Sequence, residues 1–259
     1  MFSDITYQEF SKKYLNLDYN AFSILSQSSN YKTTKKNTAP SAWDWREHGD
    51  VTKPGDQGPC SAAYAFSTIG NLEGLYAIHE KKLTKLSIQL IIDCDNNDSG
   101  CNGGMMDRTI DWIKNHGLMK EEDYPYTGMV GTCKADPSKY INMKVIGMEK
   151  VGGDSSTPTD EGIMAEYLYE HAPLIVALNG SPLQFYQDGI IDEDENECPH
   201  SLLNHAALVV GYGNEDGLDY WIVKNNWGEV WGEGGYFRIS RGKSTCGINY
   251  YVVSAKVKF

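Results

Sequence analysis

The spacing of apolar residues changes once along this chain, near residue 145. From residue 61 to about residue 79, apolar side chains recur at steps of three and four, which predicts a helix with one buried face. Residues 86–94 and 106–116 predict two more helices, and Gly117 ends the second. Beyond residue 145 the apolar runs are short and rich in β-branched and aromatic residues, as strands are. The predicted strands are residues 174–178, 206–210, 220–223, 236–239 and 251–253, and residues 211–217 are a predicted turn.

This change of period favours an α+β fold with a helical half and a sheet half, each with its own core, and a cleft between them. The chain has 259 residues, 41% of them hydrophobic, enough for one large domain or two half-domains. No run approaches the ~18 apolar residues of a membrane span, and the net charge of −12 argues against nucleic acid. We therefore expect neither a membrane nor a nucleic acid as partner. The acidic run at residues 192–197 lacks the ligand pattern of a calcium loop, so we expect no metal or other cofactor.

The cysteine count suggests disulfides. The six cysteines include no C-x-x-C pair, which argues against zinc and thioredoxin-type sites, and they allow 15 pairings. Three disulfides would place the protein in an oxidising compartment. The N-terminus from Met1 to Asp4 lacks the basic and apolar regions of a signal peptide, so the two observations together predict a trimmed chain.

Residues 56–67, with the sequence DQGPCSAAYAFS, open the first predicted helix. This stretch resembles the nucleophile segment of the papain-like cysteine peptidases, which has the local form C-G-[SA]-C-[WY]. Cys60, Ala62 and Tyr64 fit that form, whereas Ser61 replaces the glycine. Ala63 stands where the family has its nucleophilic cysteine. The resemblance covers residues 39–259 and is cathepsin-L-like.

Three residues match the rest of the family's catalytic set, in family order. His205 begins an apolar run and follows position 63 within the separation of about 130–150 residues seen in the family. Asn225 matches the residue that orients the imidazole, with Trp227 shielding their bond, and Gln57 matches the side-chain donor to the oxyanion. Asn226 departs from the family's usual serine. A cysteine peptidase needs a thiolate, an imidazole, an orienting group and oxyanion donors, and here only the thiol is missing.

The resemblance also implies a fold and a disulfide pattern. It implies a two-lobed papain-like structure, with a helical lobe at about residues 51–145 and an antiparallel β-barrel-like lobe at about residues 146–259. The cleft between these lobes would hold the active site. The implied disulfides are Cys60–Cys101, Cys94–Cys133 and Cys198–Cys246.

Substrate recognition in the family implies a second group of residues. Gly103 and Gly104 match the segment that pairs with the substrate backbone, where glycine allows close approach. An apolar residue of modest size is expected two positions before the cut, because Tyr251 would make the pocket shallow. The expected partners are polypeptide substrates and cystatin-like or propeptide-like inhibitors. The residues that match the main specificity pocket are Met105, Met106, Ala177, Leu203 and Tyr251, although Met105 also suits an ordinary core position.

Residues 1–38 resemble the C-terminal part of a cathepsin-L-type inhibitory propeptide. Asp4 or Thr6 is predicted to cap a short helix that places Phe10 and Tyr14 on one face. By resemblance, residues 20–38 would run backwards through the cleft, with a cleavage point near Thr38 or Ala39. The family and the disulfides imply a lysosome- or vacuole-like or extracellular location, and sequons at Asn97 and Asn179 permit glycosylation.

Ala63 leaves three interpretations open. The intact Gln57, His205 and Asn225 favour a cysteine endopeptidase whose nucleophile has been replaced, inactive as it stands. The departures at Ser61 and Asn226 favour a natural pseudoprotease that acts as a binding or scaffold protein. The third is an unrelated hydrolase or transferase that uses His205 with an external nucleophile. Ser61 and Ser67 are poor substitutes for a nucleophile at position 63, since neither occupies its place on the helix.

Overall fold

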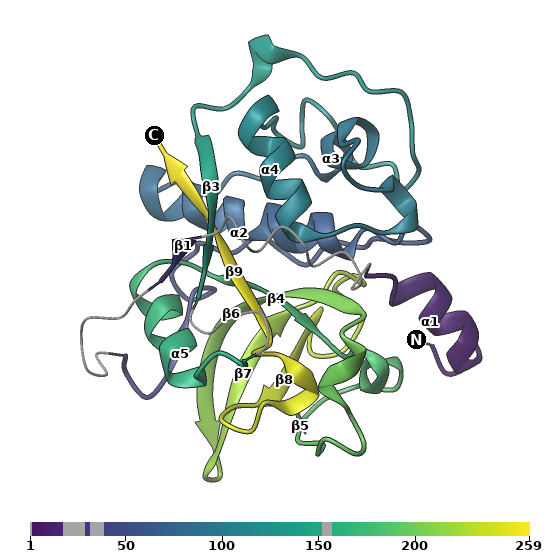
Figure 1. The fold of residues 1–259 in the computed structure, drawn as a ribbon, viewed down its shortest axis with the longest axis vertical. Coiled ribbons are helices and arrows are strands. Elements are labelled where there is room, and N and C mark those ends of the chain that lie inside the picture. Colours follow the sequence, from purple (N-terminus) through teal and green to yellow (C-terminus); the bar gives the residue numbers. More distant parts are fainter. Residues whose placement is uncertain (1, 18–28, 32–38, 152–156) are drawn as a thin grey trace.

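The computed structural model describes residues 2–17, 29–31, 39–151 and 157–259. Among these residues, no helix is long and apolar enough to cross a membrane. The α-helices are α1 (Tyr7–Tyr14), α2 (Ala63–Glu80), α3 (Ile88–Cys94), α4 (Met106–His116) and α5 (Glu161–Glu170), and short 3-10 turns are η3 (Gly100–Asn102), η4 (Pro137–Lys139), η5 (Ser181–Gln184), η6 (His200–Leu202) and η7 (Thr245–Gly247). The helices α2, α3 and α4 gather at one end of the molecule, and most of the strands lie at the other, with α1 and α5 beside them (Figure 1).

The three predicted helices of the first half are confirmed, with small shifts at their ends. Most side chains of α2 are buried, which explains why apolar residues occur on all of its faces. The Ser87 hydroxyl starts α3 by accepting a hydrogen bond from the Leu90 N–H. Gly117, with φ of 97°, ends α4 in a backbone conformation that favours glycine.

The strands form one sheet with the order β1-β3-β9-β4-β6-β7-β8-β5, and β2 pairs with β6. All pairs are antiparallel except β1 with β3 and β5 with β8. This arrangement confirms the predicted α+β class. The strands are β1 (Ser29–Asn30), β2 (Trp43–Asp44), β3 (Lys144–Lys150), β4 (Leu174–Leu178), β5 (Ile190–Ile191), β6 (His205–Glu215), β7 (Leu218–Lys224), β8 (Tyr236–Ser240) and β9 (Tyr251–Lys258).

The predicted turn at residues 211–217 is wrong. β6 continues through Glu215, and only Asp216 and Gly217 connect it to β7. The glycines in this stretch serve close packing instead: a Cβ on Gly211 would lie 2.6 Å from the Trp43 carbonyl oxygen of β2. Sequence periodicity also missed β3 and α5, the helix on the sheet half that begins at the Asp160 cap.

The apolar core is divided by the sheet, not by the two halves of the chain. One cluster joins α2, α3 and α4 to one face of the sheet, including Ile175 and Val253. The other lies on the opposite face and includes Leu168 of α5 and Phe10 of α1. The expectation of a separate core for each half is therefore wrong, because the helical half buries its apolar faces against the strands. The structure contains the disulfides Cys60–Cys101, Cys94–Cys133 and Cys198–Cys246, the same pairs that the resemblance implies.

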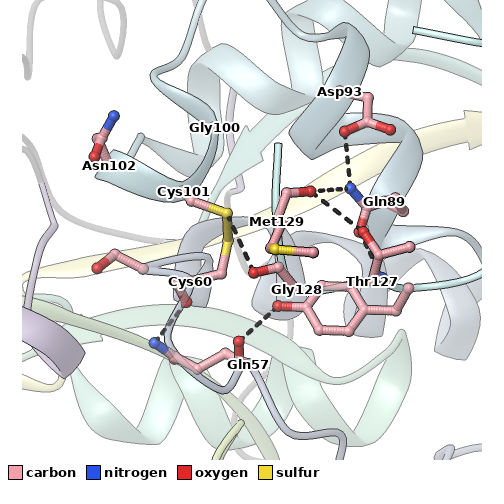
Figure 2. Close-up of a disulfide and its surroundings, with 12 residues drawn as sticks. Gln57, Cys60, Gln89, Asp93, Gly100, Cys101, Asn102, Thr127, Gly128 and Met129 are labelled. Atoms are coloured by element: carbon pink, nitrogen blue, oxygen red, sulfur yellow. Dashed lines mark hydrogen bonds between the residues drawn. A yellow bond between two sulfur atoms is a disulfide. The ribbon is translucent and has the colours of Figure 1, made fainter. Parts of the chain in front are cut away.

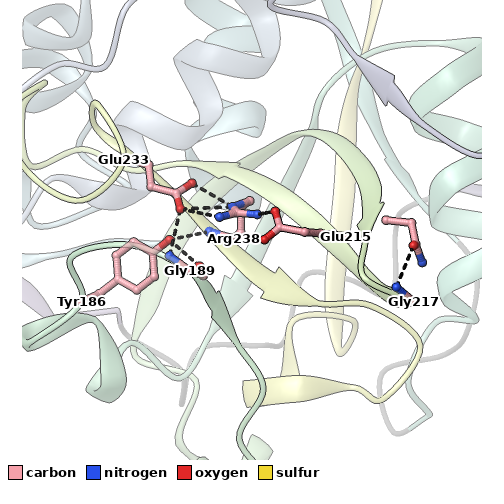
Figure 3. Close-up of polar contacts among 7 residues, drawn as sticks. Tyr186, Gly189, Glu215, Gly217, Glu233 and Arg238 are labelled. Atoms are coloured by element: carbon pink, nitrogen blue, oxygen red, sulfur yellow. Dashed lines mark hydrogen bonds and ion pairs between the residues drawn. The ribbon is translucent and has the colours of Figure 1, made fainter.

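An ion-pair network holds β8 to the loops on either side of it (Figure 3). Arg238 donates to both oxygens of Glu233 and pairs with Glu215 of β6. Gly189 donates its N–H to Glu233, and the Tyr186 hydroxyl bonds the Gly189 carbonyl. Glu233 belongs to the loop between β7 and β8, which also carries Trp227. The network therefore fixes the base of the loop that carries Trp227.

Candidate active site

Ala63 is the first residue of α2, which places it at the positive end of the helix dipole. The segment before it is held to the neighbouring η3 turn by the Cys60–Cys101 disulfide and by a hydrogen bond from the Ser61 N–H to the Cys101 carbonyl (Figure 2). A side chain at position 63 therefore projects from a fixed backbone at the N-terminal end of α2.

Gln57 lies buried next to this segment. Its backbone N–H donates to the Asn226 carbonyl at 2.9 Å, and its carbonyl accepts from the Tyr126 hydroxyl at 2.8 Å. Its amide Nε2, the oxyanion donor that the resemblance implies, donates to the Cys60 carbonyl at 2.9 Å (Figure 2). The hydrogen bond from Gln57 Nε2 to the Cys60 carbonyl closes residues 57–60 into a turn. This turn holds the Gln57 side-chain amide near the start of α2.

His205 and Asn225 come from the ends of two adjacent antiparallel strands. β6 begins at His205, and Asn225 follows the last residue of β7. His205 Nε2 lies 2.8 Å from Asn225 Oδ1, so in the neutral ring Nε2 carries the proton and Nδ1 is the basic nitrogen. The Trp227 ring packs against the imidazole, with ring centroids 4.9 Å apart, and shields that bond from water. The structure thus brings together the histidine, the asparagine and the tryptophan that the sequence singled out.

Burial lowers the pKa of His205 to about 4, and hydrogen bonding to Asn225 and the nearby backbone of Tyr14 opposes this shift. Among the described residues, none forms a hydrogen bond of normal geometry with His205 Nδ1. The Tyr14 backbone lies close enough to the ring to raise its pKa but does not meet that geometry. The imidazole is completely buried. Its neutral form is therefore the stable one as long as the site stays covered.

The N-terminal segment, residues 2–17, covers the His205 imidazole. α1 starts with a capping box in which Thr6 and Glu9 bond each other's backbone N–H groups, so the predicted Thr6 cap is confirmed. Phe2, Phe10 and Tyr14 surround the Trp227 ring, with centroids 5.2, 5.4 and 5.8 Å from it. The predicted shared face of Phe10 and Tyr14 is thus the face that contacts the site.

Residues 13–17 continue from α1 across the site. The Ser61 hydroxyl donates to the Lys13 carbonyl at 3.1 Å, and the Asn16 side chain donates to the Asn102 carbonyl at 2.9 Å. Leu17 donates its N–H to the Asn204 carbonyl at 3.2 Å and forms a parallel bridge with Gly104. A Cβ on Gly103 would collide with the Asn16 carbonyl, so this approach needs glycine.

The expectation that residues 20–38 fill the cleft is contradicted only at Ser29 and Asn30. The described residues that contact the site are residues 2–17, because α1 docks on Trp227 and directs the chain after it onto Gly104. Residues 18–28 and 32–38, including the expected cleavage point at Thr38, lie outside the described residues. Ser29 and Asn30 pair with the edge of β3 instead.

A cavity of about 460 Å³ adjoins Leu17, Gly103 and Gly104. Of the five residues that match the family's specificity pocket, Leu203 lines this cavity, and all five are buried in the apolar cluster against which Leu17 packs. Sequence reasoning missed Asn204 and Arg108, which also line it. Asn204 follows Leu203 directly, and its backbone carbonyl, not its side chain, makes the contact with Leu17, so no residue type signals that role.

The two sequons differ in exposure. Asn97 is exposed, whereas Asn179 is 1% exposed and its side-chain amide donates to the Pro199 carbonyl. Glycosylation at Asn179 would have to break that bond and open the β4–η5 connection.

We expect acid to release the N-terminal segment. His205 has a depressed pKa in the folded chain, so its contribution to stability is full above its unfolded value near 6.5 and is lost as pH falls toward about 4. The imidazolium can be hydrated only if residues 13–17 leave it. Hydrogen exchange of the Leu17 amide should therefore accelerate between pH 6.5 and 4 after correction for the intrinsic rate. A His205→Gln variant should lack this acceleration, and equal acceleration in both proteins would contradict the expectation.

Similarity to known proteins agrees with this geometry. Residues 39–256 match the family described as "Papain family cysteine protease". Cysteine proteinase A of Leishmania mexicana is 39% identical over 263 residues, which cover 99% of this chain and 71% of that protein. Cathepsin F of Mus musculus is 38% identical, covering 99% of this chain and 54% of that protein.

A solved structure of digestive procathepsin L 3 from the Tenebrio molitor larval midgut superposes with a TM-score of 0.86 at 35% identity, covering 98% of this chain and 80% of that one. The chain belongs to the papain family of cysteine proteases, and it is similar to cathepsins L and F.

Proposed function

We propose that this chain carries the acyl-transfer machinery of a cathepsin-L-like cysteine endopeptidase and is inactive as it stands because Ala63 has no nucleophilic atom. The observation that supports this most directly is the 2.8 Å bond between His205 and Asn225, covered by Trp227. A site that had lost its selection for catalysis would have no physical reason to keep a buried, oriented and otherwise unsatisfied imidazole.

With a cysteine at position 63, each group has a defined task. His205 Nδ1 takes the thiol proton, and the helix terminus and the imidazolium stabilise the thiolate. The thiolate attacks the scissile carbonyl, whose oxyanion binds the residue 63 N–H and Gln57 Nε2. His205 then protonates the leaving amine, and a water that it deprotonates hydrolyses the thioester. Asn225 keeps the ring in the tautomer that this sequence of steps needs.

The proposed substrate is an extended polypeptide that pairs with Gly103 and Gly104. Leu17 already makes this type of contact, in the parallel sense. An apolar side chain two residues before the cut would enter the cavity beside Leu203. We propose that residues 1–38 are an inhibitory propeptide remnant, that residues 39–259 are the peptidase domain, and that the protein works in a lysosome-like, vacuole-like or extracellular compartment. Cystatin-like inhibitors would compete for the same cleft.

The alternative is a natural pseudoprotease that binds peptides or partners without cutting them. Asn226 supports it, because its side chain bonds the Ala206 carbonyl directly after His205, where the family usually has serine. The two proposals differ in whether the groups around position 63 still activate a thiol.

The reactivity of the thiol in an Ala63→Cys variant distinguishes the endopeptidase proposal from the pseudoprotease proposal. If the machinery is intact and the N-terminal segment is first released at pH 4, alkylation by a small haloacetamide should stay fast well below pH 8, since the thiolate persists beside the imidazolium. An ordinary thiol with a pKa near 8.5 would instead lose about tenfold in rate per pH unit below that value. The matched control is the same variant with His205→Gln, which should behave as the ordinary thiol. Identical pH profiles for the two variants would favour the pseudoprotease.

A further inference from the structure

The segment that meets Leu17 is held from behind by a single carboxyl group. The Asp98 side chain is completely buried, and its Oδ1 accepts the Met105 N–H at 2.8 Å. Its Oδ2 accepts the Thr109 hydroxyl at 3.0 Å, one turn into α4. Met105 is the N-cap of α4 and has no side-chain cap of its own, so Asp98 supplies the bonds that start the helix.

The same carboxyl lies directly against Gly104. A Cβ on Gly104 would stand 2.7 Å from both Cγ and Oδ1 of Asp98. Gly104 also forms the bridge to Leu17. The neighbouring Ser99 N–H donates to the Gly103 carbonyl at 3.0 Å, which ties the two ends of this loop together. The segment Gly103–Met105 thus contacts both the buried Asp98 side chain and Leu17, the present occupant of the cleft.

We propose that Asp98 is a positioning residue for peptide binding, and that its ionisation sets how firmly Gly103–Met105 holds a chain in the cleft. This deepens the proposed function and rests on it for the identity of the peptide. The protonated carboxyl keeps Oδ1 as an acceptor for Met105 and loses only its charge. The ionised carboxylate adds a charge to an interior that already holds other acids.

The surroundings of Asp98 decide when that charge appears. Burial raises the pKa of Asp98 to about 7, hydrogen bonds from Met105 and Thr109 oppose this, and the charge of Asp95 adds to it. Burial also raises the pKa of Asp95. The only cation of the described chain paired with Asp98 is Arg108, at 3.9 Å. The other titratable groups that act on this carboxyl pair are His116 through Asp95, Tyr64, and Tyr251 with its neighbour Asp107.

The sign follows from the direction of the shift. A carboxyl whose folded pKa is raised stabilises the fold most at low pH, and that contribution is lost as pH rises toward the folded value near 7. Between pH 6 and 8 the second charge appears beside Asp95, and the loop should loosen. The Asp98 contribution is lost as pH rises and the His205 contribution is lost as pH falls, so the two effects have opposite signs and can be told apart.

Hydrogen exchange in the full chain tests the proposal without any turnover. Asp98→Ala should accelerate exchange at pH 6 about tenfold at the Met105 amide and also at the Leu17 amide across the cleft. Asp98→Asn keeps an acceptor and should stay within about twofold of the unmodified chain at pH 6. The unmodified chain should lose Leu17 protection from pH 6 to pH 8 after correction for the intrinsic rate, whereas Asp98→Asn should not. Asp111→Asn, an exposed carboxyl on α4, is the matched control and should change neither amide.

Two results would overturn the proposal. Loss of protection at Met105 with Leu17 unchanged would make Asp98 a helix cap with no role in the cleft. The same pH response in Asp98→Asn as in the unmodified chain would remove Asp98 as the titrating group. Neither result depends on whether an Ala63→Cys variant cuts peptides, so failure of the proposed function would be seen separately.

Discussion

Replacing Ala63 with cysteine is expected to raise peptide hydrolysis by about 10⁵- to 10⁶-fold over the unmodified chain. In a serine peptidase, loss of the nucleophile alone costs about 10⁶ in kcat, and the other members of its triad lose their effect with it. Here the His205–Asn225 bond, the Trp227 cover and the α2 terminus are already in place. Restoring one sulfur should therefore recover most of that factor.

The measurement is hydrolysis of a fluorogenic peptide with an apolar residue two positions before the cut. Both proteins should be pre-incubated at pH 4 with a mild reductant, because protonation of His205 favours departure of residues 13–17. Ala63→Ser is the control for side-chain volume, since its hydroxyl is a far weaker nucleophile at this pH than the thiolate. A folded Ala63→Cys protein with no more turnover than Ala63→Ser would contradict the endopeptidase proposal.

The sequence predicted the parts of this structure that local patterns determine. α2 and α4 were predictable from apolar spacing, and Gly117 marked the end of α4. His205 and Asn225 could be selected because each sits in a short motif at the end of a strand. Their mutual bond is a contact between distant segments, and the resemblance to the papain-like peptidases implied it.

What the sequence could not predict depends on contacts between distant segments. Residues 13–17 reach the site because α1 docks on Trp227, and nothing in that stretch encodes its partner. Gly211 and Gly213 looked like turn residues, but they are strand residues that admit the Trp43 carbonyl and the Tyr220 ring. Asp98 occupies a loop of polar residues, where a buried carboxyl has no distinct pattern.

The second large effect is expected at a charge pair that joins the two halves of the molecule. Glu73 lies in α2, the helix that begins at Ala63, and Lys224 ends β7 directly before Asn225. The Thr52 hydroxyl donates to Glu73 at 2.5 Å and accepts from Lys224 at 2.7 Å, so one oxygen connects the two charges. Glu73 also accepts the Leu86 N–H at 2.8 Å.

Burial dominates the titration of both groups. It raises the pKa of Glu73 and lowers the pKa of Lys224, and each partner's charge only partly offsets the shift of the other. Removing the half-buried Lys224 therefore leaves the charge of Glu73, which is 4% exposed, in a poorly solvated interior. Breaking a buried pair in this way costs about 3–5 kcal/mol, more than either charge contributes when paired.

Lys224→Met should consequently lower the free energy of unfolding by about 3 kcal/mol, or about 6–12 °C in Tm for a chain of this size. Urea unfolding at pH 8 gives the free energy of unfolding of each variant.

The double variant Glu73→Gln with Lys224→Met is the control and should recover most of the lost stability, because it leaves no buried charge. The raised pKa of Glu73 means that its neutral form is favoured at low pH, so the deficit of Lys224→Met should shrink from pH 8 to pH 5. A deficit under 1 kcal/mol, or one that does not change with pH, would mean that solvent reaches the pair. A confirmed deficit would show that the contact between α2 and the end of β7, directly before Asn225, depends on an ion pair that no catalytic step uses.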